Sequence, residues 1–142
     1  MELEGTIRKV DMKHRLVFGW AYVAKDADGT TVVDSQEDFI ADDWELERAA
    51  YDYVVKSRDG SDTHVVKGLA TLVESVVFTK DKIRAMGLNE ADVPTGWWVG
   101  MRITNDKLLA KVQSGEYTSF SIGGKGIRKR GPAPETHRRQ SA

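Results

Sequence analysis

The sequence predicts a single α+β domain in which a curled sheet or barrel is surrounded by helices. Three observations support this fold class. The chain has 142 residues, which is enough for one hydrophobic core and too few for two comfortable domains. Most of its apolar segments are short and rich in aromatic and branched side chains, as strands are. Two or three segments with helical periodicity are inserted between them, which favours helices packed outside one sheet.

The composition is that of an ordinary soluble protein, with 40% hydrophobic and 30% charged residues and a net charge of -1. The lack of cysteine excludes a disulfide framework, Cys-based zinc sites and a cysteine nucleophile, and it fits a reducing cytoplasm. The charged N-terminus does not have the pattern of a signal peptide. No stretch approaches the roughly 20 apolar residues that a membrane-spanning helix needs.

The N-terminal part is predicted to form three strands. Residues 3–10 alternate loosely, and residues 15–24 are strongly apolar, with Gly19 as a bulge or a point of close approach. The segment DADGT at residues 26–30 has the composition of a turn, so the short strand after it returns as a hairpin. A calcium loop is a poorer interpretation of this segment, because the later ligands and the distal glutamate are missing.

A helix is predicted from about Ser35 to Lys56. Ser35 and Asp38 have the spacing of a capping box, although the box prefers Glu or Gln at its second position. The acidic residues on the other face are interpreted as a solvated surface and not as metal ligands, and Trp44, outside the apolar stripe, marks a contact. The apolar stripe consists of Phe39, Leu46, Ala50 and Tyr53.

His64 begins a strand that continues, after a break at Gly68, through residues 69–78. The apolar residues of this second part predict burial on both faces. Glu74 interrupts the run, and a carboxylate there should be paired or face a functional site, because an unpaired buried charge is costly.

Further helices alternate with one more strand. Thr79 is predicted to cap a short helix at residues 80–87, and residues 97–103 (WWVGMRI) are predicted to form a strand. Thr104 is predicted to cap a further helix that stops at Gly115.

The stretch from Gly115 to Gly124, GEYTSFSIGG, is the main candidate for chemistry. On a strand, Ser119 and Ser121 share one face, while Phe120 and Ile122 share the other. A hydroxyl on a stiff strand beside glycines can be approached closely by a carbonyl, but it is a weak nucleophile that needs a base. The sequence has no P-loop, dinucleotide fingerprint, GxSxG elbow or HExxH motif, and no cofactor or metal is predicted.

The three histidines differ in their suitability as that base. His64 lies where a loop joins a strand, so it can be both positioned and accessible, and an imidazole with a pKa of about 6.5 suits proton transfer near neutral pH. The alternative interpretation of His64 is an exposed polar turn residue. His14 lies in the turn MKHR between two strands and His137 in the C-terminal tail, so both are weaker candidates.

Three segments follow one another in an informative order: the segment from Gly19 to Ala50, then His64 followed by LVESVVFTKD, then GWWVGMRITNDKLLAKVQSGEYTSFSIGG. Together they resemble the XkdF-type phage serine proteases, relatives of the prohead maturation proteases and, more distantly, of the herpesvirus assemblin protease. The resemblance runs from about Gly5 to Gly124. The combination of H…LVES, W-V-G-x-R-I and S-G-x-x-x-x-F-S-I-G-G is more specific than any one of these motifs.

The resemblance implies a barrel of mostly antiparallel strands with surrounding helices, and a serine endopeptidase that cuts scaffold and capsid-precursor proteins inside the assembling capsid. It assigns the nucleophile to Ser121 and the base to His64, with Ser119 as the fallback nucleophile. The oxyanion would be stabilised by backbone amides near the end of this strand, with Gly123 and Gly124 as candidate donors.

The third triad residue is where the sequence departs from the family. In prohead proteases this residue lies on an apolar strand after the serine, whereas the sequence after Gly124 predicts no such strand. Either the chain is part of a longer protein, or Glu74 or His137 takes this place, or the domain is weakly active or inactive.

Residues 1–124 are expected to form the protease-like domain, and residues 125–142 a basic, flexible tail with a net charge of +5. Arg128 and Arg130 in this tail are weak candidates for oxyanion stabilisation, because a basic run is more often solvated or bound to a polyanion. The alternative function is a non-enzymatic assembly module that docks into the procapsid, with the tail bound to acidic scaffold or DNA.

The expected partners are the scaffold and major capsid proteins and a second copy of the chain as a homodimer. The expected location is the host bacterial cytoplasm, inside the assembling procapsid. No membrane contact is expected. Binding of nucleic acid is not expected, except through the basic tail, because the aromatic residues lie in apolar strands and are not interleaved with Lys and Arg.

Overall fold

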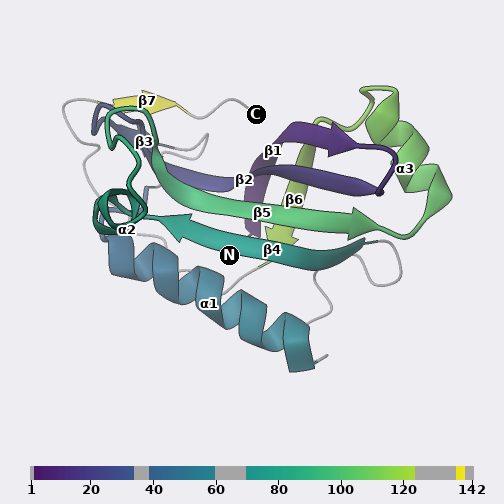
Figure 1. Cartoon of the computed structure of the whole chain (residues 1–142), viewed down its shortest axis with the longest axis horizontal. Helices are drawn as coiled ribbons and strands as arrows, with labels where there is room; N and C mark the ends of the chain where they lie inside the picture. The colour runs from purple at the N-terminus through teal and green to yellow at the C-terminus, as the bar shows by residue number, and fades with distance from the viewer. Residues whose placement is uncertain (1, 34–38, 60–69, 124–136, 140–142) are drawn as a thin grey trace.

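The computed structural model describes residues 2–33, 39–59, 70–123 and 137–139 (Figure 1). In these ranges the elements are, in chain order, β1 (Glu2–Asp11), β2 (Leu16–Lys25), β3 (Thr31–Val33), α1 (Asp43–Asp59), β4 (Ala70–Phe78), α2 (Lys80–Ala85), β5 (Thr95–Ile103), α3 (Asp106–Gln113), β6 (Ser119–Gly123) and β7 (His137–Arg139).

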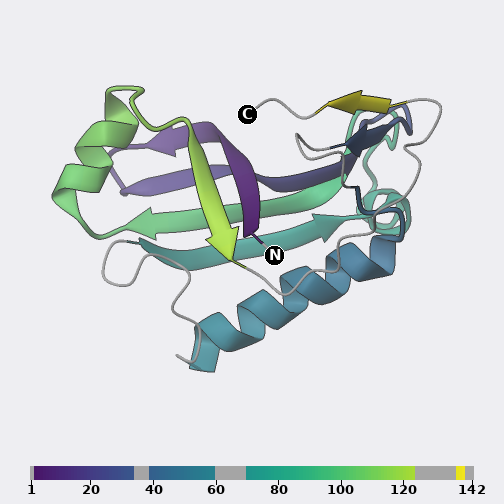
Figure 2. The same cartoon turned by 180° about the vertical axis from the view of Figure 1, so that it is seen from behind.

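Five strands pair in the order β4-β5-β2-β1-β6, and all four pairings are antiparallel. The predicted α+β class is therefore confirmed. The predicted barrel is not found in the described part of the chain, because the end strands β4 and β6 do not pair with each other. The sheet instead curls: β6 and the first part of β1 run steeply across the direction of β4 and β5 (Figure 2). A register shift between Ile7 and Lys9 contributes to this curl, since bulges bend and twist a strand.

The hydrophobic core lies between the sheet and the helices α1 and α3. The helices contribute one face each, and the side chains of β2, β4 and β5 that share the inner face complete the core. The largest fully buried side chain is that of Trp97, which contacts the Tyr53 ring at a centroid distance of 5.5 Å. Other core residues are Val17, Ala21, Leu46, Ala50, Val77, Val99, Met101, Ile103, Leu109 and Val112.

The first strands meet as the sequence predicts. A Cβ atom on Gly19 would lie 2.0 Å from the carbonyl oxygen of Thr6, so only glycine allows β1 and β2 to approach at this point. The predicted turn after β2 is also confirmed: Gly29 has a φ of 90°, and the Asp26 N–H donates to the Thr30 carbonyl at 2.8 Å.

The helix α1 begins later than the sequence predicts. It starts at Asp43, where the side chain of Asp42 accepts a hydrogen bond from the Trp44 N–H at 3.0 Å. Ser35 and Asp38, the predicted capping box, lie outside the described residues. Of the predicted apolar stripe, Leu46, Ala50 and Tyr53 are buried on the helix, whereas Phe39 is half-buried and precedes it. Trp44 is 56% exposed, with its ring 6.4 Å from that of Tyr51.

The prediction that β4 is buried on both faces is wrong. Of its residues only Val77 is buried, and all the others are half-buried or exposed. The physical reason is its position at the end of the strand order, which leaves one long edge without a neighbouring strand.

The predicted caps of the short helices are right in one case and wrong in the other. The Thr79 side chain accepts from the Lys82 N–H and caps α2. α3 is capped by Asn105, whose side chain accepts from the Leu108 N–H, and not by Thr104. Asn is the more favourable N-cap of the two residue types, so the residue type itself favours Asn105 over Thr104. Gly115, with a φ of 80°, ends α3 as predicted.

The tail contains one short strand that the sequence does not predict. The three residues of β7, HRR, pair in parallel with β3. This pairing uses the backbone edge of β3, so no apolar pattern in the sequence signals it. Residues 124–136 and 140–142 lie outside the described ranges. None of the helices in the described ranges combines the length and apolar character needed to cross a membrane.

A charged cluster joins α1 to α2. The Lys82 ammonium is 2.8 Å from a Glu47 carboxylate oxygen, and it donates to the hydroxyl of Tyr51 at 2.6 Å. Burial alone would raise the pKa of Glu47, but the hydrogen bonds from Lys82 and Tyr51 outweigh it and leave this pKa below its ordinary value. Burial alone would lower the pKa of Lys82, but its own hydrogen bonds to Glu47 and Tyr51 leave this pKa raised.

Glu47→Gln is expected to lower the free energy of unfolding by about 1 kcal/mol near neutral pH. Because the folded pKa of Glu47 is depressed, its contribution is present above the unfolded value of about 4.3 and is lost as pH falls through the folded value. Lys82 retains its own contribution until the pH rises through its raised pKa, above about 10.4. Urea unfolding of both proteins from pH 3 to 9 measures the difference.

The half-buried pair of Asp52 and Lys56, one turn apart on the same helix, provides a matched control. Asp52→Asn should change the free energy of unfolding by no more than about 0.5 kcal/mol. A Glu47→Gln difference that does not depend on pH would contradict the assignment of the effect to the carboxylate charge.

Candidate active site

The candidate serines lie on β6, an end strand of the sheet (Figure 2). β6 pairs with the beginning of β1, so that Ser119 is opposite Thr6 and Ser121 is opposite Glu4. The predicted strand is therefore confirmed, and α3 leads into it through the turn at Gly115. Since a strand has a period of two, Ser119 and Ser121 occupy the same face of the sheet.

The register also determines which backbone groups of β6 are free. The Ile7 N–H donates to the Thr118 carbonyl at 2.9 Å, so these opposite residues form a hydrogen-bonded pair. Hydrogen-bonded and non-hydrogen-bonded pairs alternate in antiparallel strands, which places the N–H and C=O groups of Ser119, Ser121 and Gly123 on the side away from β1. β1 is the only neighbour of β6 among the described strands. This edge can therefore bind an extended polypeptide through backbone hydrogen bonds.

Two predicted site residues lie outside the described residues. They are His64, the predicted base, and Gly124, a predicted oxyanion donor. In the chain His64 belongs to the connection between α1 and β4. Its proximity to Ser121 therefore stays a prediction. Arg128 and Arg130 also lie outside the described ranges.

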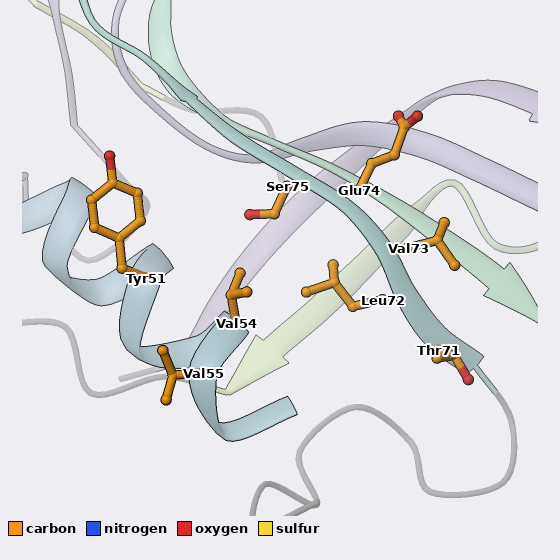
Figure 3. A pocket seen from close by; sticks show the side chains of 8 residues that line it. All are labelled: Tyr51, Val54, Val55, Thr71, Leu72, Val73, Glu74 and Ser75. Atoms are coloured by element: carbon orange, nitrogen blue, oxygen red, sulfur yellow. The ribbon is translucent and has the colours of Figure 1, made fainter. Parts of the chain in front are cut away.

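Glu74 lies on β4, at the opposite end of the strand order from β6. Its side chain is exposed, and Figure 3 shows its carboxylate directed away from α1. The Glu74 side chain lies near Phe18 on the outer face of the sheet, because a Cβ atom added at Gly100 would contact both of them. The cost of a buried charge, which suggested a partner for Glu74, does not arise at this exposed position. Its role as an orienting carboxylate stays a prediction.

The other two histidines lie away from β6. His14 is exposed in the turn after β1, where its ring nitrogen is 2.9 Å from the carboxylate of Asp11, as expected of a hairpin tip. This hydrogen bond lowers the pKa of Asp11. His137 begins β7, which pairs with β3 and not with β6. Neither residue is placed on or next to the serine strand.

A groove separates α1 from β4. It has a volume of about 570 Å³ (Figure 3). The side chains of Val54, Leu72 and Ser75 lie between the helix and the strand. Ser75 also accepts a hydrogen bond from the Trp97 indole N–H at 2.8 Å. The full lining consists of Tyr51, Val54, Val55, Thr71, Leu72, Val73, Glu74 and Ser75.

Sequence reasoning missed this groove because its residues have the pattern of a buried core. Val54 and Leu72 belong to apolar runs that the periodicity assigns to the inside of the domain. The end position of β4 exposes them, and a single sequence contains no signal for strand order. A weak signal in the sequence was Val55, an apolar residue next to the main apolar stripe of the helix. In the structure its side chain is 57% exposed.

The chain was compared with known protein families. Residues 4–129 match the family described as "Putative phage serine protease XkdF". The match includes β6 with both serines and the segment that contains His64. No curated protein and no solved structure matches the chain.

Proposed function

The chain belongs to the phage serine protease XkdF family, and from this membership we propose that it is a prohead maturation protease. In this proposal it is a serine endopeptidase that cleaves scaffold and capsid-precursor proteins while the capsid assembles. The family match over most of the chain is the observation that carries the proposal. The matched residues include the motifs that carry the resemblance, among them the serine strand β6.

The position of Ser121 supports the chemistry. A protease must hold its substrate extended, and a strand edge does this through the backbone of the substrate, whatever its sequence. Ser121 lies on such an edge strand. Because hydrogen-bonded and non-hydrogen-bonded residue pairs alternate between β1 and β6, the N–H and C=O groups of Ser121 lie on the side away from β1. A peptide bound there would lie beside the candidate nucleophile.

The proposed reaction has two steps. The Ser121 hydroxyl attacks the scissile carbonyl carbon while His64 takes its proton, and His64 then gives this proton to the leaving amine, which breaks the C–N bond. Water next attacks the acyl-enzyme with His64 again as base, which releases the acid product and restores the serine. The Gly123 N–H, on the free side of β6, is the proposed donor to the oxyanion.

The proposal includes the partners and the place of action. The substrates are the scaffold and major capsid proteins, and the reaction takes place in the procapsid within the host bacterial cytoplasm. A second copy of the chain and, through the basic tail, acidic scaffold or DNA are further proposed partners. These follow from the family resemblance and from the +5 charge of residues 125–142.

Labelling with a fluorophosphonate tests whether the serine is activated. We expect the reagent to modify the folded chain at Ser121, as identified by mass spectrometry of the digested protein, because only a serine with a base beside it reacts quickly. The Ser119→Ala variant should still be labelled, and the Ser121→Ala variant should not. A folded chain that is not labelled would favour the non-enzymatic assembly module instead.

A further inference from the structure

The α1–β4 groove lies along β4, one of the two end strands of the curled sheet. β4 forms one wall, and β6 is the strand at the other end of the order. Figures 2 and 3 look from different directions, and in both the carboxyl end of β6 points toward α1. A polypeptide bound along the free edge of β6 would therefore extend toward the α1 side of the sheet, where the groove lies.

The wall formed by β4 offers backbone hydrogen-bonding groups. The Ile103 N–H donates to the Arg15 carbonyl at 2.8 Å, so Ile103 directs its backbone groups toward β2. Because the direction alternates along a strand, every second residue of β5 directs its N–H and C=O groups to β2 and the residues between them direct theirs to β4. With the register of β4, this leaves the N–H and C=O groups of Leu72 and Ser75 on the side away from β5. The carbonyl of Val77, which follows the same alternation, indeed accepts from Lys82 and not from a strand.

The inside of the groove is apolar and without charge. Its facing side chains, those of Val54 and Leu72, are hydrocarbon, and the hydroxyl oxygen of Ser75 accepts a hydrogen bond from the Trp97 indole. The one ionisable carboxylate in the lining, that of Glu74, is directed away from the helix. A charged side chain that entered between Val54 and Leu72 would lose its hydration, and the two charges that adjoin the lining residue Tyr51, those of Lys82 and Glu47, already pair with each other.

We propose that this groove binds an uncharged apolar side chain of the polypeptide that Ser121 cleaves, and that it selects the substrate sequence. This proposal rests on the protease function proposed above. The occupant is an extended segment of a protein substrate, because the groove combines an apolar interior with free strand-edge groups at Leu72 and Ser75. The volume of about 570 Å³ leaves room for a side chain as large as Leu or Phe.

Binding can be measured without catalysis by using the full chain with the Ser121→Ala substitution. The probes are four blocked octapeptides of alanine and threonine with one central residue, which is Leu, Phe, Asp or Lys. We expect the Leu and Phe peptides to shift the methyl NMR signals of Val54, Val55 and Leu72, and to bind about 10-fold or more tightly than the Asp and Lys peptides. Equal shifts with all four peptides, or no shift with any, would overturn the proposal.

A charge introduced at the mouth of the groove should reverse this preference. Val55→Lys, at an exposed helix position where lysine is well tolerated, is expected to favour the Asp peptide over the Leu peptide. Val10→Lys is the matched control, since Val10 is 39% exposed on β1, outside the groove. The same change of preference in both variants would show a general charge effect and would contradict the groove as the binding site.

A third variant tests the size of the groove. Val54→Phe places a ring between α1 and β4, so it should weaken binding of the Phe peptide more than that of the Leu peptide. The protease function and the binding of a side chain in the groove can be tested separately. Labelled Ser121 without methyl shifts would remove the groove and keep the protease, whereas selective methyl shifts in a chain that is never labelled would keep a peptide-binding groove without proteolysis.

Discussion

Ser121→Ala is expected to abolish processing of capsid and scaffold precursors when the protein is co-expressed with them. Removal of the nucleophile from a serine protease costs about four to six powers of ten in rate, because no other group can form the acyl-enzyme. Such a loss leaves no detectable cleavage on the time scale of an assembly experiment. Gel electrophoresis of the capsid and scaffold proteins, with mass spectrometry of their new termini, measures the result.

Ser119→Ala is the matched control, because Ser119 lies one pleat from Ser121 on the same strand and face. It should leave processing within a factor of a few of the unmodified chain. Loss of cleavage in Ser119→Ala with normal cleavage in Ser121→Ala would transfer the nucleophile to Ser119. Processing that is normal in both variants would contradict the protease proposal for this strand.

Trp97→Ala is expected to lower the free energy of unfolding by about 3–5 kcal/mol, the usual cost of truncating a buried aromatic side chain. Trp97 is 1% exposed, contacts the Tyr53 ring, and donates its indole N–H to Ser75. The substitution would thus remove the ring contact between β5 and α1 and leave a cavity. Urea denaturation followed by circular dichroism measures the difference.

The neighbouring tryptophan provides the control. Trp98 lies on the opposite face of β5, half-buried, with its ring 5.2 Å from that of Trp20. Trp98→Ala should cost only about 1–2 kcal/mol, since less surface returns to water and no deep cavity forms. Equal effects of the two substitutions would contradict the assignment of the core to the α1 side of the sheet.

The sequence by itself determined the features that depend on local chemistry. The turn at residues 26–30, the cap at Thr79, the stop at Gly115 and the serine strand follow from residue types at short spacing, and all four are found. Such features depend on interactions within a few residues, so one sequence suffices to predict them. The family likewise followed from an ordered set of motifs, and the family match confirms it.

Only the tertiary structure decided which strands are neighbours. An apolar run such as residues 70–78 is compatible with a central or an end strand, and its placement at the end exposes Glu74 and opens the groove beside Leu72. The same holds for β6, whose free edge depends on its pairing with β1 from the other end of the chain. These contacts join residues far apart in sequence, and hydrophobic periodicity is a property of each segment alone, so it contains no information about partners.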